Sequence, residues 1–241
     1  MTERPAFYAL RGGGWRDWWS LLHPPYTLWH LSYVVFGAAA APNVDVARLV
    51  KTLIAFFLAV GIGAHALDEL NGRPLKTRIP AAALWTAASL SIAGAVAIGV
   101  ANVRLVGWAG APFIAFGSFI VVAYNVELFG GRFHSDVWFA LSWGAFPAFT
   151  AYWAQAGRFE ARSLLVAGAC LFLSIAQRAL STPVRELRRR TVAVHGTMER
   201  SDGTLEPITR ATLIAAPEQA LRAMSVALPL VAAGAAIARL R

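Results

Sequence analysis

The segment 63–78 reads GAHALDELNGRPLKTR and places ionisable side chains between two long apolar runs. On a helix His65 lies three residues before Asp68 and four before Glu69, so the three side chains share a face. Carboxylates such as those of Asp68 and Glu69 are ligands for hard cations like Mg²⁺, and the guanidinium of Arg73 can bind phosphate through paired hydrogen bonds. The spacing therefore predicts a site for a divalent ion and a phosphate. The alternative is a hydrophilic turn closed by one salt bridge.

A second polar segment, 123–136, reads AYNVELFGGRFHSD and follows another apolar run. Tyr124 and Glu127 are three residues apart and can face one cavity, and Asn125 lies between them. A Gly-Gly pair then ends the helix, because glycine disfavours helix formation. The alternative is an aromatic residue at the membrane surface followed by a polar helix exit.

A third segment, 174–190, reads SIAQRALSTPVRELRRR and is strongly basic. Its polar candidates include Gln177, Arg178 and Arg185, and arginine is well suited to binding phosphate. The alternative is a basic patch beside the membrane that attracts anionic lipid heads.

These segments belong to a chain with the composition of a membrane protein. Of its 241 residues, 57% are hydrophobic and 15% are charged, whereas a soluble domain has about 25% charged residues. A helix needs about 20 mostly apolar residues to cross the hydrocarbon core. The apolar runs predict an all-α, polytopic transmembrane helix bundle that forms one membrane domain over 1–241. About seven spans are predicted, at 26–41, 49–67, 80–101, 107–128, 137–156, 163–180 and 218–239.

The distribution of basic residues predicts how the bundle lies in the membrane. Lys and Arg residues number 14 on the side of the N-terminus and 7 on the other side, and the richer side is cytoplasmic by the positive-inside rule. Residues 1–24 are therefore expected to be cytoplasmic, with an interfacial helix in the tryptophan-rich stretch 15–25. Residues 181–215 are expected to form a cytoplasmic loop, in which Asp202-Gly203 suits a small hairpin. The expected location is a bacterial inner or cell membrane.

The three polar segments follow the second, fourth and sixth predicted spans, so they reach the same membrane face. Together they could ring the mouth of a cavity that holds the charged head of a membrane lipid, with the tail between helices. No nucleic-acid partner is expected, because the net charge of +9 is not gathered in a basic soluble domain. A small transporter is a further alternative, although no internal repeat supports it.

With these motifs, the chain resembles the UbiA superfamily of intramembrane prenyltransferases. The stretch RDWWSLLHPPYTLWHLSYVVFGAAAA is similar to the family's interfacial helix and first span, and AHALDELNGRPLKTRIP to its first Asp-rich motif. The stretch AYNVELFGGRFHSDVWFALSWGAFPAFTAYWAQAG resembles the region of helices four and five, and LSTPVRELRRR lies where the second Asp-rich motif would be. The chain diverges from the family: Ala64 and His65 replace the usual Asn and Asp, the second motif has no Asp, and there are fewer spans.

The resemblance implies transfer of a prenyl group from an isoprenoid diphosphate to an acceptor, with Mg²⁺ neutralising the charge of the leaving group. In that reaction Asp68 and Glu69 would be catalytic and would bind Mg²⁺. The diphosphate would be held by Arg73, Lys76, Arg178 and Arg185, and the prenyl and acceptor cavity would be lined by His65, Asn71, Tyr124, Asn125 and Glu127. The alternative is a homologue that has lost the chemistry and binds a lipid or a partner enzyme.

Overall fold

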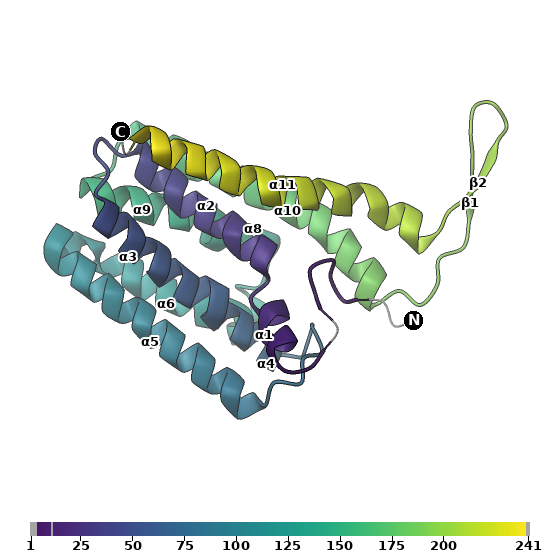
Figure 1. Ribbon diagram of the computed structural model, residues 1–241, viewed down its shortest axis with the longest axis horizontal. Helices are drawn as coiled ribbons and strands as arrows, with labels where there is room; N and C mark the ends of the chain where they lie inside the picture. The colour runs from purple at the N-terminus through teal and green to yellow at the C-terminus, as the bar shows by residue number, and fades with distance from the viewer. Residues whose placement is uncertain (1–3, 11, 240–241) are drawn as a thin grey trace.

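The computed structural model describes residues 4–10 and 12–239, so Arg11 and Arg241, which enter the charge count, lie outside the described residues. The described chain is almost entirely helical (Figure 1). Its first half contains α1 (Trp15–Leu21), α2 (Pro24–Ala40), α3 (Val46–Phe56), η1 (Phe57–Ala64), α4 (His65–Leu70), α5 (Ala81–Val106), η2 (Trp108–Gly110) and α6 (Ala111–Asn125). Its second half contains α7 (Leu128–Gly131), α8 (Asp136–Phe139), η3 (Ala140–Ala145), α9 (Phe146–Ala156), α10 (Ala161–Arg189), β1 (Thr197–Glu199), β2 (Leu205–Pro207) and α11 (Arg210–Arg239).

Five helical segments of the described chain are long and apolar enough to cross a membrane, which indicates an integral membrane protein. They are Val46–Leu70, Ala81–Val106, Trp108–Asn125, Ala161–Arg189 and Arg210–Arg239. The first and fifth predicted spans, 26–41 and 137–156, are also helical and lie within the bundle. They do not meet the same criterion, and α2 has only 17 residues. Five of the seven predicted spans are therefore supported by length and composition.

Helix α2 lies in the interior of the bundle and packs against α9 and α11. Trp29, Tyr33 and Val34 on this helix are completely buried. Gly37 allows the close approach to α9, because a Cβ atom at this position would lie 2.0 Å from the carbonyl oxygen of Ala148. Helices α10 and α11 pack along each other, and α5 covers α3, η1 and α4 at the opposite edge (Figure 1).

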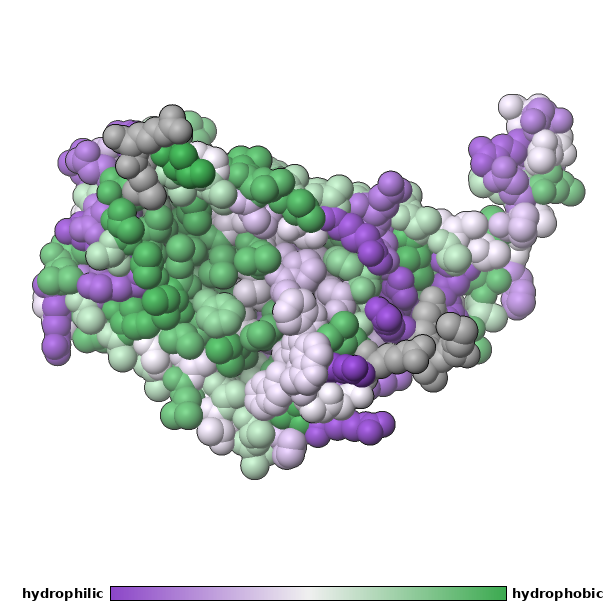
Figure 2. Space-filling view, viewed as in Figure 1, coloured by the Kyte–Doolittle hydropathy of each residue, from purple (hydrophilic) through white to green (hydrophobic). Residues whose placement is uncertain are grey.

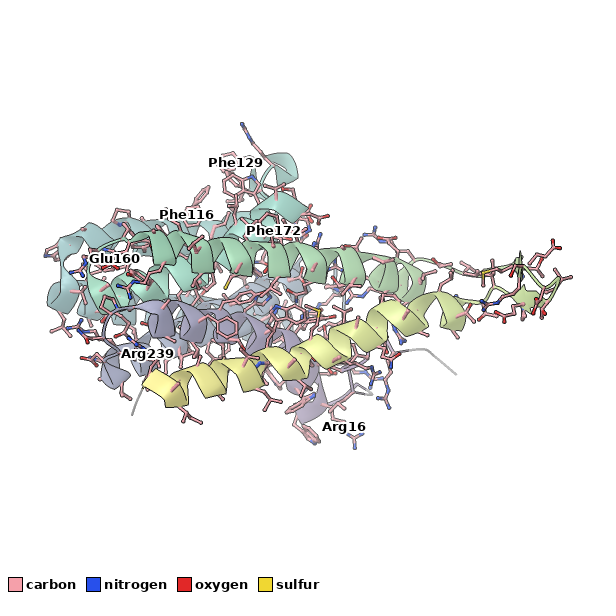
Figure 3. All side chains as sticks on the ribbon, turned by 90° about the horizontal axis from the view of Figure 1, so that it is seen from above. Arg16, Phe116, Phe129, Glu160, Phe172 and Arg239 are labelled. Atoms are coloured by element: carbon pink, nitrogen blue, oxygen red, sulfur yellow. The ribbon has the colours of Figure 1, made fainter. Side chains whose placement is uncertain are left out.

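The surface of the bundle has the polarity expected in a membrane. Apolar side chains cover much of its flank, whereas hydrophilic side chains gather toward its ends and on the hairpin (Figure 2). On α10 Phe172 is 69% exposed and projects from the flank, while Glu160 and Arg239 lie at the end far from the hairpin (Figure 3). Trp15 and Trp19 on α1 are also exposed, as the predicted interfacial helix requires.

The predicted loop 181–215 is shorter than expected, because α10 continues to Arg189 and α11 begins at Arg210. Pro183 does not end α10, although proline removes one backbone hydrogen bond from a helix. The predicted hairpin is confirmed: β1 pairs antiparallel with β2, and Gly203 at the turn has φ +83°. The hairpin extends well beyond the bundle (Figure 1).

Candidate functional site

A polar cavity of about 510 Å³ opens at the end of the bundle where α4, α6 and α10 end. Its wall contains eight of the eleven side chains predicted for the site: His65, Asp68, Asn71, Tyr124, Asn125, Glu127, Arg178 and Arg185. The prediction that the three polar segments converge on one hollow is therefore confirmed. The roles assigned to these residues remain predictions.

Two short π-helical segments shape the cavity wall. In a π-helix the hydrogen bonds shift by one residue, and such segments often occur at functional sites. In η1 the carbonyl oxygen of Gly61 lies 3.1 Å from Nδ1 of His65. The main-chain N–H of His65 donates to the carbonyl oxygen of Ile62 and not to that of Gly61. In η3 the carbonyl oxygen of Trp143 lies 2.9 Å from Nδ1 of His30. In each case an imidazole that lines the cavity is anchored to the carbonyl of a π-helical residue.

Glu69 lies outside the cavity wall, contrary to its predicted catalytic and metal-binding role beside Asp68. Its side chain is buried, and its carboxylate accepts hydrogen bonds from the main-chain N–H groups of Leu75 at 3.0 Å and Thr77 at 2.8 Å. Successive residues of an α-helix point about 100° apart, so Asp68 faces the cavity while Glu69 faces the following loop. Both oxygens of Glu69 therefore organise the chain between α4 and α5.

Arg73 and Lys76 also lie outside the cavity wall, contrary to their predicted role in binding diphosphate. The Arg73 guanidinium donates to the carbonyl oxygens of Ile79 at 2.7 Å and Thr77 at 3.4 Å, so it is bound within its own loop. Lys76 is exposed at the surface. Both residues have positive φ, 53° and 56°, and this tight loop conformation, which sequence spacing does not reveal, directs them away from the cavity.

Asp17 makes a second carboxylate clamp on the same loop. It is buried, accepts from the main-chain N–H of Arg78 at 3.0 Å and from that of Gly13 at 3.0 Å, and so joins the N-terminal segment to the loop before α5. Asp17 and Glu69 thus fix the loop between α4 and α5 through hydrogen bonds, but neither side chain lines the cavity.

The guanidinium groups along α10 divide into paired and unpaired ones. Arg178 contacts Asp136, with 2.5 Å between Nη2 and Oδ1, and Arg190 contacts Glu186 at 3.0 Å. Arg185 donates only to the hydroxyl of Thr182 at 3.2 Å, and Arg189 donates to the carbonyl oxygen of Pro5 at 3.2 Å. In the described chain neither of these two half-buried arginines forms an ion pair with a carboxylate. The cavity therefore presents two positive charges that lack anionic partners.

The carboxylates of the cavity do not form a metal-binding group. Those in its wall are Asp68, Glu127 and Glu186; Glu186 pairs with an arginine, and Glu127 lies 3.9 Å from His134. Within residues 4–10 and 12–239 no three or more His, Cys, Asp and Glu side chains are arranged to hold a metal ion. Because Glu69 is engaged elsewhere, the residues present do not fit a Mg²⁺ shared by Asp68 and Glu69.

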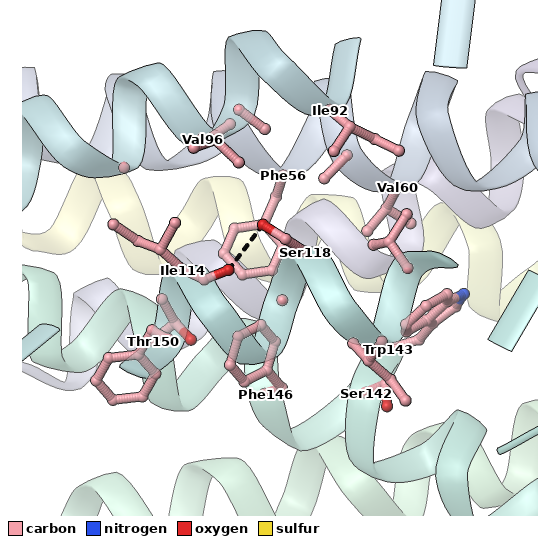
Figure 4. A pocket seen from close by; sticks show the side chains of 18 residues that line it. Phe56, Val60, Ile92, Val96, Ile114, Ser118, Ser142, Trp143, Phe146 and Thr150 are labelled. Atoms are coloured by element: carbon pink, nitrogen blue, oxygen red, sulfur yellow. Dashed lines mark hydrogen bonds between the residues drawn. The ribbon is translucent and has the colours of Figure 1, made fainter. Parts of the chain in front are cut away.

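An apolar cavity of about 110 Å³ lies next to the polar one and shares Trp143 with it. Its wall is built from α3, η1, α5, α6, η3 and α9, with side chains that include Phe56, Ile92, Ile114 and Phe146 (Figure 4). A further apolar cavity of about 70 Å³ shares Phe56 and Ile114 with it. A hollow with almost no polar lining therefore borders the polar cavity at Trp143, and a second such hollow borders the first.

The N-terminal segment covers part of the mouth of the polar cavity. Tyr8 lines the cavity, and its ring packs against His23 at 5.2 Å and Tyr26 at 5.5 Å. Burial raises the pKa of the Tyr8 phenol, and burial together with the nearby His65 holds the pKa of His23 well below its usual value. Both side chains are therefore uncharged at neutral pH.

Several wall residues were not predicted. They include Tyr8, His23, Tyr26, His30, His134 and Ser181. His30 could have been found seven residues after His23, at helical spacing, but it lies inside the apolar run 26–41, which was interpreted as a membrane span. His134 lies within the quoted second segment, and only its folding back onto Tyr124 brings it to the cavity. Comparisons with models of protein families, with curated proteins and with solved structures found no match to this chain.

Proposed function

We propose that this chain is a UbiA-like membrane protein that binds an isoprenoid lipid through its phosphate or diphosphate head. The observation that carries the proposal is the Arg185 guanidinium, which faces the polar cavity and has no carboxylate partner among the described residues. A half-buried charge that lacks a partner is costly, and an anion that binds there supplies the missing interaction. Arg189 adds a second such group one helical turn away.

The apolar cavities support a lipid with a tail rather than free phosphate. The larger one shares Trp143 with the wall of the polar cavity (Figure 4). Both lie between α3, α5, α6 and α9. A bound apolar chain would fill hollows lined by aromatic and branched side chains, and its burial is worth about 25 cal/mol per Å². Head and tail would therefore be recognised by neighbouring cavities of different polarity.

Transfer of the prenyl group to an acceptor is the reaction that such a site would serve. Arg178, Arg185 and Arg189 would hold the diphosphate and stabilise the charge that develops on it as the carbon–oxygen bond breaks. Asp68, whose carboxylate makes no ion pair within the described part of the chain, lines the same cavity. The proposed orientation places this mouth at the cytoplasmic face, where basic residues accumulate.

A lipid-binding protein without transfer is the second candidate, and the position of Glu69 favours it. The family resemblance implies two metal-binding motifs, whereas here Glu69 is committed to the main chain of its own loop. Such a protein would keep the arginines and the apolar hollows but would not release diphosphate.

Binding of inorganic pyrophosphate to the detergent-solubilised protein tests the proposal. We expect pyrophosphate to raise the unfolding temperature, in the presence of EDTA as well as Mg²⁺. Arg185→Gln should weaken this binding about tenfold, the value of a lost charge-assisted hydrogen bond. Lys76→Gln is the matched control, because it removes a positive charge outside the cavity wall.

An Arg185→Gln variant that is stabilised as strongly as the wild type would contradict the proposal. The two candidates are then separated by incubation with geranyl diphosphate in vesicles made from a membrane lipid extract, which supplies the acceptor, and measurement of the prenylated product together with the pyrophosphate released. Release above the level of the Asp68→Ala variant favours a transferase, and binding without release favours the lipid-binding protein.

A further inference from the structure

A groove of about 460 Å³ runs along the flank of the bundle beside the interfacial helix α1. It lies between α1, η1 and α5, and almost all of its lining is apolar. Among the described residues, none that lines this groove also lines the polar cavity or the two apolar hollows, so the groove is a separate feature. Each of the three elements contributes to its wall, with Trp18 and Leu22 from α1, Leu58 and Ile62 from η1, and Ala87 and Leu90 from α5.

Two sets of contacts shape the groove. Asp17 accepts a hydrogen bond from the main-chain N–H of Arg78 at 3.0 Å, which ties α1 to the loop before α5. Segment η1 approaches α5 closely at Gly63, because a Cβ atom there would lie 2.9 Å from Cγ1 of Ile92 and 3.1 Å from Oγ of Ser91. Helix α1 is therefore held beside two closely packed helices, near the start of α5 (Figure 1), and the groove remains between the three elements.

The groove faces the membrane and matches one leaflet in depth. At its rim Trp18 is 40% exposed and Leu90 is 69% exposed, and α5 is one of the segments that are long and apolar enough to cross a membrane. Leu90 lies nine residues after Ala81, the first residue of α5, which is about 14 Å along the helix axis. Half of the hydrocarbon core is about 15 Å thick. The acyl chain of a lipid in this leaflet therefore matches the groove in polarity and in length.

Positive side chains gather at the end of the groove where α1 meets the loop before α5. Arg16, Lys76 and Arg78 are exposed, and Arg16 lies at the outer edge of the bundle (Figure 3). Asp17 is the one carboxylate of α1 and of the loop 71–80, and it is buried against main-chain N–H groups. Within the described part of the chain none of the three exposed cations forms an ion pair. This end of the groove therefore attracts an anionic head group.

We infer that the groove binds an anionic phospholipid, with an acyl chain between α1, η1 and α5 and the phosphate head at Arg16 and Arg78. The lipid would bridge α1 and the loop before α5, the same two segments that the hydrogen bond between Asp17 and Arg78 joins. It would thereby hold the interfacial helix against the bundle. This site lies outside the polar cavity, and its occupation does not depend on the proposed function.

Native mass spectrometry of the full chain in detergent tests the inference, with palmitoyl-oleoyl phosphatidylglycerol and phosphatidylcholine as probes. The two lipids have the same acyl chains, and only phosphatidylglycerol has a net negative charge. A basic side chain near an anionic head group contributes about 1 kcal/mol, which corresponds to about fivefold in Kd. With two arginines at the head, we expect the first molecule of phosphatidylglycerol to bind about thirtyfold more tightly than phosphatidylcholine.

Substitutions separate the head from the tail. Arg16→Gln or Arg78→Gln should each reduce the preference for phosphatidylglycerol about fivefold, and the double variant should abolish it. Arg104→Gln is the control, because it removes an exposed arginine from the last turn of α5. Ala87→Trp fills the groove and should weaken the binding of both lipids about tenfold, which corresponds to a loss of about 55 Å² of buried acyl surface. Ala97→Trp, at an exposed position of α5 outside the groove, is its control.

Equal affinity of the wild type for the two lipids would overturn the inference. So would an unchanged phosphatidylglycerol preference in the double arginine variant, or unchanged binding of both lipids in Ala87→Trp. Addition of pyrophosphate separates this site from the polar cavity. Phosphatidylglycerol should stay bound in its presence, and displacement of the lipid would assign it to the polar cavity and refute the groove. Failure of pyrophosphate itself to bind refutes the proposed function and leaves the groove unaffected.

Discussion

Replacing Glu69 by alanine should unfold the loop that closes the site rather than remove a catalytic group. The carboxylate is 99% buried and receives two main-chain N–H groups, from Leu75 and Thr77. In Glu69→Ala both donors stay in place without an acceptor. The adjacent carboxylate of Asp68 faces the cavity and has no comparable hydrogen bonds to residues 4–10 and 12–239, so Asp68→Ala is the matched control.

The expected magnitude follows from these two hydrogen bonds. A hydrogen bond to a charged group contributes about 1.5–3 kcal/mol, so the loss of both amounts to about 3–6 kcal/mol. This is a large fraction of the typical 5–15 kcal/mol stability of a folded domain. Glu69→Gln retains one carbonyl acceptor and should lose about half as much. Asp68→Ala should leave stability unchanged within about 1 kcal/mol, because it leaves no buried donor unpaired.

Thermal unfolding of the three variants in one detergent, followed by circular dichroism, measures these differences. Proteolysis between α4 and α5 gives a local readout, since the loop should be cut faster in Glu69→Ala than in Asp68→Ala. The reasoning fails if Glu69→Ala is as stable and as protease-resistant as the wild type. It fails equally if Asp68→Ala shows the larger loss of stability.

Three further predictions concern packing and charge. Gly37→Val should lower stability by about 3 kcal/mol, because its side chain would overlap the carbonyl of Ala148; Gly168→Ala, with no atom within 4 Å, should be neutral or stabilising by up to about 1 kcal/mol. Asp17→Ala should detach the N-terminal segment from the loop before α5. A protease should then cut the chain before α1 faster than in the wild type, while the rate of cutting in the hairpin stays unchanged. Two neighbouring arginines lower the pKa of Glu160 from 4.5 to about 2, so the stabilisation that Glu160 gives relative to Glu160→Gln should be present above pH 4.5 and disappear as pH falls toward 2.

Two features could be predicted from the sequence for physical reasons: the all-helical fold, and the convergence of the three polar segments that follow the second, fourth and sixth predicted spans. Apolar runs long enough to cross a membrane indicate helices. Because successive spans cross the membrane in opposite directions, the ends of every second span lie at the same membrane face. Residues such as Asp68, Tyr124 and Arg185 were therefore found from their place at helix ends.

The direction of individual side chains in the loop after α4 was not predictable in this way. Asp68 and Glu69 are adjacent and chemically alike, and only the hydrogen bonds to the following loop show that one faces the cavity and the other does not. Arg73 was assigned to phosphate by its residue type, whereas in the structure it has a positive φ and its guanidinium donates to the carbonyl oxygens of Thr77 and Ile79 in its own loop.

Three of the four histidines of the cavity, His23, His30 and His134, were missed for a different reason, whereas His65 was predicted. The arrangement of the cavity depends in part on the π-helical segments η1 and η3, whose carbonyl groups anchor His65 and His30. Such segments have no simple sequence period, and an isolated histidine in an apolar run gives no indication of a partner 113 residues away. Their clustering became visible only when the helices were packed together.

The most direct test of the central claim is photo-labelling with a prenyl diphosphate that carries a diazirine on its tail, followed by peptide mapping of the labelled residues. If the head binds among the arginines and the tail occupies the apolar hollows, the label is found on lining residues such as Phe56 and Phe146, and excess pyrophosphate prevents it. Label on the flank of α10, at Leu164, Leu165 or Phe172, that pyrophosphate does not reduce would contradict the account.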